Sequence, residues 1–323
     1  MEKVVNLLSM RVIRKTNEAD GICSFELIAE SGEELPAFTA GAHLDVQIPG
    51  PENFVRQYSL ANSPADRKRY LIGVLLDASG RGGSRSMHER VNEGDLLRVS
   101  PPKNHFPLVP DTRSALILAG GIGVTPLLAM AEELHRNHVS FDFHYAARSV
   151  ARMAFRKRLE KSPYTERVHF YLDDQSSGQP LNLTTILSTP NPGVHLYICG
   201  PRGFLDAAIG VAHASGWSEA QIHFEAFSNQ VQEAGDAFDL RLARSERIIR
   251  VGANEPVIHA LSRNGIEVPT SCEQGVCGTC LTRVISGIPD HRDMYLTQQE
   301  RERNDQFLPC CSRSRSSILV VDL

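Results

Sequence analysis

The hydrophobic pattern of the chain changes character about a third of the way along it. Before that point, short apolar or alternating runs recur between polar turns, at residues 24–30, 43–48, 70–76 and 95–100. Runs of this length predict the strands of an antiparallel β-barrel. Later the pattern alternates between buried strands, such as ALILAG at 115–120, and helical stretches, such as TPLLAMAEELHRN at 125–137. This alternation predicts a parallel α/β domain.

A polar and aperiodic stretch, SNQVQEAGD at 228–236, follows the α/β pattern and predicts a linker. Beyond it, FDLRLA and RIIRV predict a hairpin, PVIHALSRNG a short helix and ILVVDL a final strand. We therefore expect domains at 1–108, 109–228 and 237–323, with a linker at 229–236.

Composition and charge exclude several classes of protein. The chain has 323 residues and a formal charge of -4, and no stretch concentrates lysine and arginine, so neither nucleic acid nor an anionic membrane is expected as a partner. The N-terminus lacks the pattern of a signal peptide, and no run of eighteen apolar residues occurs. We expect a cytoplasmic protein, by default a monomer, whose clustered cysteines are metal ligands or catalysts rather than disulfides.

Three cysteines lie close together near the C-terminus. Cys272, Cys277 and Cys280 form C-x4-C-x2-C, and Cys310 follows after 29 further residues. This spacing is typical of a plant-type 2Fe-2S cluster, and the glycines between the ligands leave backbone N–H groups free to approach it. A structural zinc site usually has two short cysteine pairs, so it fits poorly, and incidental buried thiols are the other alternative. Cys311 could replace Cys310 by count alone.

Two turns in the α/β pattern contain glycine directly after a predicted strand. GGIGVTP at 120–126 follows a buried strand and opens a helix, where backbone N–H groups can receive a pyrophosphate. Tight packing of the turn is the alternative explanation. VHLYICGP at 194–201 places Cys199 at the carboxyl edge of the sheet, where open α/β folds bind ligands. A buried strand cysteine is the alternative there.

Two motifs lie in the barrel pattern. RQYSL at 56–60 combines a guanidinium for a phosphate, an aromatic ring for stacking and a hydroxyl for a ring nitrogen. GRGGSRS at 80–86 precedes a predicted helix and offers a second anion site. Each has an ordinary alternative, since tyrosine on a strand is usually core and a glycine-rich loop can simply be flexible.

The motifs RQYS, GRGGS, GGIGVTP, CGP, FEAF and CEQGVCGTC, with Cys310, occur in one order along the chain. Together they resemble the phthalate dioxygenase reductase family, the single-chain reductases of Rieske oxygenases that include the vanillate demethylase reductases. The resemblance covers essentially the whole chain, including DHRDMYL at 290–296. It implies a multidomain protein: an FMN-binding antiparallel β-barrel, a ferredoxin-reductase-like NAD-binding α/β domain, and a β-grasp ferredoxin domain with a plant-type 2Fe-2S cluster.

The resemblance also implies roles for particular residues. Arg56 and Arg81 would face the FMN phosphate, Tyr58 would pack on the isoalloxazine and Ser59 would lie near N5. The other implied FMN-site residues are Gln57, Gly82, Gly83, Ser84 and Phe227. The implied NADH-site residues are Gly120, Gly121, Gly123, Thr125, Pro126, Cys199, Gly200 and Pro201. The implied catalytic set is Ser59, Cys199 and Glu225, and the implied cluster ligands are Cys272, Cys277, Cys280 and Cys310. For Glu225 and Phe227 the alternative is that IHFEAF is an edge strand with one exposed acid.

The implied activity is electron transfer from NADH through FMN and the cluster to a Rieske-type oxygenase acting on an aromatic or similar small substrate. Arg148 and Arg152 could instead favour NADPH, although no dedicated phosphate pocket is evident. A cytochrome P450 or diiron hydroxylase could be the acceptor, and a non-enzymatic redox sensor is the alternative from another class. Residues 237–323 hold eleven acidic and eleven basic residues, which predicts weak long-range steering toward a partner.

Overall fold

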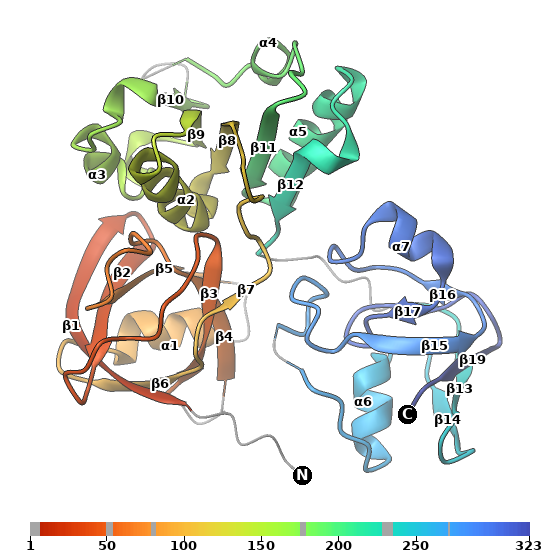
Figure 1. Cartoon of the computed structure of the whole chain (residues 1–323). Coiled ribbons are helices and arrows are strands. Elements are labelled where there is room, and N and C mark those ends of the chain that lie inside the picture. Colours follow the sequence, from red (N-terminus) through yellow and green to blue (C-terminus); the bar gives the residue numbers. More distant parts are fainter. Residues whose placement is uncertain (1–6, 50–53, 79–81, 175–178, 228–234, 271) are drawn as a thin grey trace. The chain divides into compact units, whose positions relative to one another are not determined.

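The computed structural model describes residues 7–49, 54–78, 82–174, 179–227, 235–270 and 272–323. Contacts divide the chain into two compact units, Met1–Glu225 and Ala226–Leu323, and each unit is described by itself. The first unit contains a barrel and an α/β sheet, and the second contains a small mixed sheet (Figure 1).

The barrel is built from antiparallel strands, as the alternating pattern predicts. They are β1 (Leu8–Ala19), β2 (Ile22–Ala29), β3 (Ala42–Ile48), β4 (Phe54–Ser59), β5 (Tyr70–Leu75), β6 (Leu96–Val99) and β7 (Lys103–Asn104). The sheet order is β4-β3-β6-β1-β2-β5, with β7 paired to β3. A bridge between Leu60 and Ile72 joins the end of β4 to β5 and closes the barrel. The helix α1 (Gly83–Arg90) buries Met87 in the barrel core.

The α/β part has five parallel strands in the order β10-β9-β8-β11-β12. These are β8 (Ser114–Gly120), β9 (Ser140–Ala147), β10 (Val168–Leu172), β11 (Val194–Cys199) and β12 (Ile222–Glu225). The order reverses beside β8, so the carboxyl ends of β8 and β11 flank the switch point at which such sheets bind ligands.

Helices cover both faces of this sheet. They are α2 (Val124–Arg136), α3 (Arg156–Glu160), α4 (Leu183–Ile186) and α5 (Arg202–Ala214), with 3₁₀ turns η1 (Gly121–Gly123), η2 (Val150–Arg152), η3 (Thr165–Arg167) and η4 (Glu219–Gln221). Figure 1 shows α2 and α3 on one side of the sheet and α5 on the other. Residues 124–131 of α2 are all buried, because the helix is packed between the sheet and the barrel.

The second unit has the β-grasp arrangement of a mixed sheet crossed by a helix. Its main sheet has the order β14-β13-β19-β15-β17, and β16 pairs with β18. The elements are β13 (Phe238–Leu242), β14 (Ile248–Val251), α6 (Val257–Arg263), β15 (Thr282–Ser286), β16 (Pro289–Asp290), α7 (Gln298–Arg303), β17 (Gln306–Phe307), β18 (Arg313–Ser314) and β19 (Ile318–Val321). Val257, Ala260 and Leu261 of α6 belong to its hydrophobic core.

The predicted fold class is confirmed, and the predicted hairpin, short helix and final strand of the C-terminal region are present as β13–β14, α6 and β19. The pattern did not predict β1, where a register shift next to Val12 leaves Ile13 exposed. The border at residue 108 and the linker at 229–236 stay predictions, and most of that linker lies outside the described residues. Among the helices described, none has the length and apolarity to cross a bilayer.

Candidate functional site

The turn after β8 makes close contact with the turn after β11. A Cβ atom on Gly123 would lie 2.3 Å from the Cys199 carbonyl oxygen, and one on Gly200 would lie 3.1 Å from the Gly120 Cα. Gly123 is therefore required by packing within the protein, and Gly200 allows the two turns to approach each other closely. Tight packing, which was the alternative explanation for the motif, thus accounts for part of it. Gly121 differs, because it has φ 54° and open space where a Cβ would be. Its backbone is the part of the turn that a ligand can approach.

The two residues that follow in this motif are occupied by the protein itself. Thr125 is buried, and its hydroxyl donates to the Ile122 carbonyl oxygen at 3.0 Å. Pro126 is the third residue of α2, where the missing N–H costs no helical hydrogen bond. Pro201 directly precedes α5. Contact of these three residues with a dinucleotide stays a prediction.

Cys199 ends β11, between Ala119 of β8 and Glu225 of β12 in the strand register. It thus lies at the carboxyl edge of the sheet, where the sequence pattern placed it. Its side chain is fully buried. Burial, and secondly the charge of Glu225, raise the pKa of the thiol well above its ordinary value. Because the thiolate is the nucleophile, this cysteine is suited to packing against a ligand and not to nucleophilic attack.

Glu225 joins the sheet edge to the barrel. The Ser59 hydroxyl, at the end of β4, donates to Glu225 Oε2 at 3.4 Å. Burial raises the pKa of Glu225 to about 8, and the hydrogen bond from Ser59 partly offsets that rise. The structure therefore brings Ser59, Cys199 and Glu225 together from two sheets, with a carboxyl group that holds a proton near neutral pH.

Tyr58 precedes this serine on β4 and packs against the barrel core. Its hydroxyl is buried and has no hydrogen-bond partner among the described residues. Burial raises the pKa of the phenol, so it stays neutral. A buried hydroxyl without a partner is costly, and an absent ligand beside the ring would supply the missing contact.

Gln57 lies between Tyr58 and Arg56 on the same strand, and its side chain is held by a neighbouring strand. Its amide donates to Asp45 Oδ1 at 3.0 Å, and Asp45 is also paired with Lys103. This position supports the strand, and direct contact of Gln57 with a cofactor stays a prediction.

Arg56 lies against the N-terminus of α1. A Cβ atom on Gly83 would be 3.1 Å from Arg56 Nε, so the glycine allows the guanidinium to approach the helix. Gly82 is the N-cap, with φ 98°, and no side chain of the described residues caps the helix. Backbone N–H groups at such an end, with a guanidinium beside them, suit a phosphate group. Ser84 Oγ accepts a hydrogen bond from the Asp77 backbone, whereas the predicted Arg81 lies outside the described residues.

These observations fit an FMN site. Among the described residues, the Tyr58 ring has a hydroxyl without a partner, a buried serine follows it, and the end of α1 beside Arg56 has no side-chain cap. These features match the flat and the anionic parts of that cofactor. Phe227 is half-buried and belongs to the second unit, so its predicted contact with the flavin stays a prediction.

The predicted cluster ligands lie in the second unit, where Cys272 interacts with Cys277, and Cys310 interacts with both Cys280 and Cys311. The neighbouring Cys272 thiol lowers the pKa of Cys277. In the second pair, a hydrogen bond with Cys310 is the main cause that lowers the pKa of Cys280. The part of the chain that the structure describes contains no compact group of three ligands for a single ion. Two thiol pairs fit a cluster of two irons, each iron needing two protein sulfurs.

The loop between these cysteines depends on two glycines with left-handed backbone conformation. Gly275 and Gly278 have φ 73° and 70°, and Cβ atoms there would lie 2.3 Å from Cys311 Sγ and from Tyr295 Cζ. Cys311 is buried, and its sulfur contacts the Leu308 carbonyl oxygen at 3.8 Å. Segment 293–295 thus packs against the loop.

His43 is a residue that the sequence did not single out. It is buried on β3 directly opposite Ser59, with its ring 5.4 Å from that of His105. Burial lowers the pKa of His43 to about 4, so its ring is neutral. No local motif marks it, because only the pairing of β3 with β4 brings it to the site.

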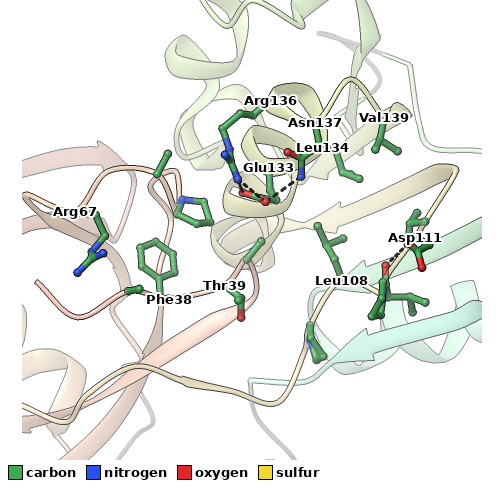
Figure 2. A pocket seen from close by; sticks show the side chains of 18 residues that line it. Phe38, Thr39, Arg67, Leu108, Asp111, Glu133, Leu134, Arg136, Asn137 and Val139 are labelled. Atoms are coloured by element: carbon green, nitrogen blue, oxygen red, sulfur yellow. Dashed lines mark hydrogen bonds and ion pairs between the residues drawn. The ribbon is translucent and has the colours of Figure 1, made fainter.

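A cavity of about 800 Å³ lies elsewhere in the first unit, between the loop that precedes β3 and the end of α2 (Figure 2). None of the predicted site residues lines it. Its two arginines are engaged with protein groups, Arg136 with Glu133 at 2.7 Å and Arg67 with the Leu35 carbonyl oxygen at 2.8 Å. Both guanidinium groups of the cavity therefore already have a protein partner.

Comparisons with known proteins agree with this geometry. The family model of the 2Fe-2S iron-sulfur cluster binding domain matches residues 240–315. The chain is 48% identical over 315 residues to the vanillate O-demethylase oxidoreductase of Pseudomonas putida. The aligned region covers 97% of this chain and 98% of that relative.

Two solved structures extend the comparison to three dimensions. The structure of phthalate dioxygenase reductase, described as modular for electron transfer from pyridine nucleotides to 2Fe-2S, has a TM-score of 0.76 and 36% identity over 98% of each chain. An intact type IV self-sufficient cytochrome P450 monooxygenase has a TM-score of 0.84 and 36% identity, over 98% of this chain and 41% of that longer one. The chain therefore belongs to the family of reductases that includes the vanillate O-demethylase oxidoreductases and phthalate dioxygenase reductase.

Proposed function

We propose that the chain is an NADH-dependent reductase that carries FMN and a 2Fe-2S cluster and supplies electrons to a Rieske-type oxygenase. One observation carries the proposal: a single chain contains both the Ser59–Glu225 contact at the sheet edge and two pairs of cysteine thiols. When bound, FMN supplies the conversion of a two-electron hydride from NADH into single electrons, and the cluster carries those electrons one at a time.

The residues of the first unit would bind and orient the flavin. Arg56 and the N-terminus of α1, with Gly82, Gly83 and Ser84, would hold its phosphate. Tyr58 would cover the ring, and its hydroxyl would gain the partner it lacks. Ser59 would donate a hydrogen bond to the reactive edge of the ring. Glu225, protonated up to about pH 8, would hold a proton next to the Ser59 hydroxyl.

The carboxyl edge of the α/β sheet would bind NADH. The open backbone at Gly121 and the N-terminus of α2 would receive the pyrophosphate. Cys199, buried and neutral, would pack beside the nicotinamide and exclude water from it. We propose NADH as the preferred dinucleotide. The 2′-phosphate of NADPH would need a dedicated pocket of several basic groups, and the loop after β9 supplies Arg148 and Arg152 without such a cluster.

The second unit would hold the cluster through Cys272, Cys277, Cys280 and Cys310. Plant-type clusters have potentials near about -400 mV, and Rieske centres lie at about -150 mV or above, so transfer to such an oxygenase is downhill. The relatives named above are a demethylase oxidoreductase and a dioxygenase reductase, which supports an oxygenase partner for this chain.

Domain layout and location complete the proposal. We place the FMN domain at 1–108, the NAD domain at 109–228, the linker at 229–236 and the ferredoxin domain at 237–323. All seven cysteines are free, which is consistent with a reducing cytoplasm. We propose that the chain acts as a monomer and binds its oxygenase transiently.

A cytochrome P450 is the second candidate acceptor, because a self-sufficient P450 monooxygenase contains a region similar to this whole chain. The two candidate acceptors differ in the group that receives the electrons, which is a heme in a cytochrome P450 and a Rieske centre in a Rieske-type oxygenase. Stopped-flow mixing of the reduced chain with each acceptor would separate them.

An absorbance spectrum before and after anaerobic NADH tests the proposed function. We expect overlapping flavin and iron-sulfur bands that bleach together when NADH is added. A folded chain that was reconstituted with FMN, iron and sulfide and still lacked both chromophores would overturn the proposal. Flavin in the purified sample would also exclude a redox sensor that contains a cluster alone.

A further inference from the structure

The segment DHRD at 290–293 resembles the family sequence, yet the proposed function gives it no task. Asp293 is its most buried residue, since the side chain has no exposed surface. A buried carboxylate is costly to the fold unless its charge is balanced by donors and cations. The structure supplies such groups from several elements of the second unit.

The Asp293 carboxylate accepts hydrogen bonds from its own segment and from the segment after Cys310. Oδ2 accepts backbone N–H groups from Tyr295 at 3.2 Å and from Leu296 at 2.8 Å. Oδ1 accepts the Ser312 hydroxyl at 3.3 Å. Burial would raise the pKa of Asp293, but the interaction with His291, the Leu296 N–H and the charge of Arg301 lower it below the ordinary value. The carboxylate is therefore ionised at neutral pH.

Asp293 and the next residue, Met294, lie between the two segments that carry the cysteines. Gly275 lies between Cys272 and Cys277, and its carbonyl oxygen accepts the Met294 N–H at 2.9 Å. A Cβ atom on Gly275 would lie 3.1 Å from the Asp293 Cα, so the two backbones are in close contact. Ser312, which donates to Asp293, follows Cys310 by two residues.

We infer that Asp293 is a positioning residue for the cluster: it holds the 272–280 loop and the segment after Cys310 in register, and its negative charge lies behind the cluster. The inference rests on the proposed function, because it takes the four cysteines as cluster ligands. Groups behind the ligands orient them and tune the metal, so this residue affects both retention of iron and redox potential.

Asp290 provides a matched control from the same segment. Its carboxylate pairs with Arg292 at 2.7 Å and Arg315 at 3.3 Å, and its side chain is 23% exposed. Asp290→Asn and Asp293→Asn remove the same charge and keep almost the same shape. Asp293 alone of the two has the contacts with both ligand-bearing segments that are described above.

The experiment compares the full-length chain and these variants in two measurements. For Asp293→Asn we expect iron release to a colorimetric ferrous chelator about tenfold faster than in wild type, the lower end of the effect of such groups on metal sites. We also expect the cluster midpoint potential, from a dye-mediated titration, to shift to a more positive value, since the added electron meets less negative charge. Asp290→Asn should release iron at the wild-type rate and shift the potential less.

Ser312→Ala keeps the test decisive if Asp293→Asn fails to fold. This variant leaves the carboxylate charged and removes one of its donors, so iron release should be faster than wild type by a few fold. Release at the wild-type rate in Ser312→Ala and in any folded Asp293→Asn, or an unchanged potential in Asp293→Asn, would overturn the inference. A wild-type chain that binds no cluster would overturn the proposed function itself.

Discussion

Glu225→Gln tests the central electrostatic claim about the sheet edge. Burial displaces the pKa of Glu225 from an ordinary value of 4.5 to about 8. That displacement corresponds to about 5 kcal/mol between the neutral and ionised forms, an upper limit because the side chain is half-buried. Glutamine resembles the protonated carboxyl group and cannot ionise, so the variant removes the pH dependence and retains the hydrogen-bonding shape.

The direction in which pH changes the free energy of unfolding follows from the pKa of Glu225 in the unfolded and in the folded chain. Below pH 4.5 the carboxyl group is protonated in both states and contributes no pH dependence. Between pH 4.5 and about 8, the unfolded chain ionises while the folded chain keeps its proton, so the free energy of unfolding of the first unit falls as pH rises. Above pH 8 the loss is complete. We expect wild type and Glu225→Gln to be equally stable at pH 4.5, with the variant gaining up to about 5 kcal/mol by pH 8.

Trp217 makes the assay specific, since it is the single tryptophan of the chain, is buried in the first unit and donates to the Leu187 carbonyl oxygen at 3.0 Å. Its fluorescence during urea unfolding of the flavin-free chain reports that unit at each pH. Glu219→Gln, in the turn before β12 and with a side chain 75% exposed, is the control and should follow the wild-type profile. Parallel profiles for wild type and Glu225→Gln would refute the burial argument.

Three further predictions use other parts of the chain. Cys277→Ser should abolish cytochrome c reduction and spare NADH-dependent bleaching of the flavin; loss of both would contradict serial transfer through the cluster. Gly123→Ala should lower the free energy of unfolding by roughly 1–3 kcal/mol or more, because its Cβ would lie 2.3 Å from the Cys199 carbonyl oxygen, whereas Gly203→Ala, with open space in α5, should not destabilise the chain. Tyr58→Phe should leave the flavin-free chain as stable as wild type, since the lost hydroxyl has no partner among the described residues, and should weaken FMN binding; a clear loss of stability without FMN would show that the hydroxyl is already paired.

The hydrophobic pattern predicted the barrel, the α/β alternation and the small C-terminal unit, because a strand or helix face repeats within a few residues. It did not predict β1, in which a register shift interrupts the alternation. Nor did the motif GGIGVTP distinguish its glycines. Only the tertiary structure shows that Gly123 is required by packing between two turns and that Gly121 has open space where a Cβ would be.

The sequence by itself determined the identity and spacing of the four cysteines and the glycine-rich turn, since covalent spacing and backbone freedom are local properties of a chain. Tertiary structure alone decided that Ser59 meets Glu225 across 166 residues, that Cys272 meets Cys277 and Cys280 meets Cys310, and that Asp293 lies behind their loop. The physical reason is that a pKa of about 8 for a carboxyl group, or an ionised aspartate without exposed surface, depends on the burial and donors that distant segments provide.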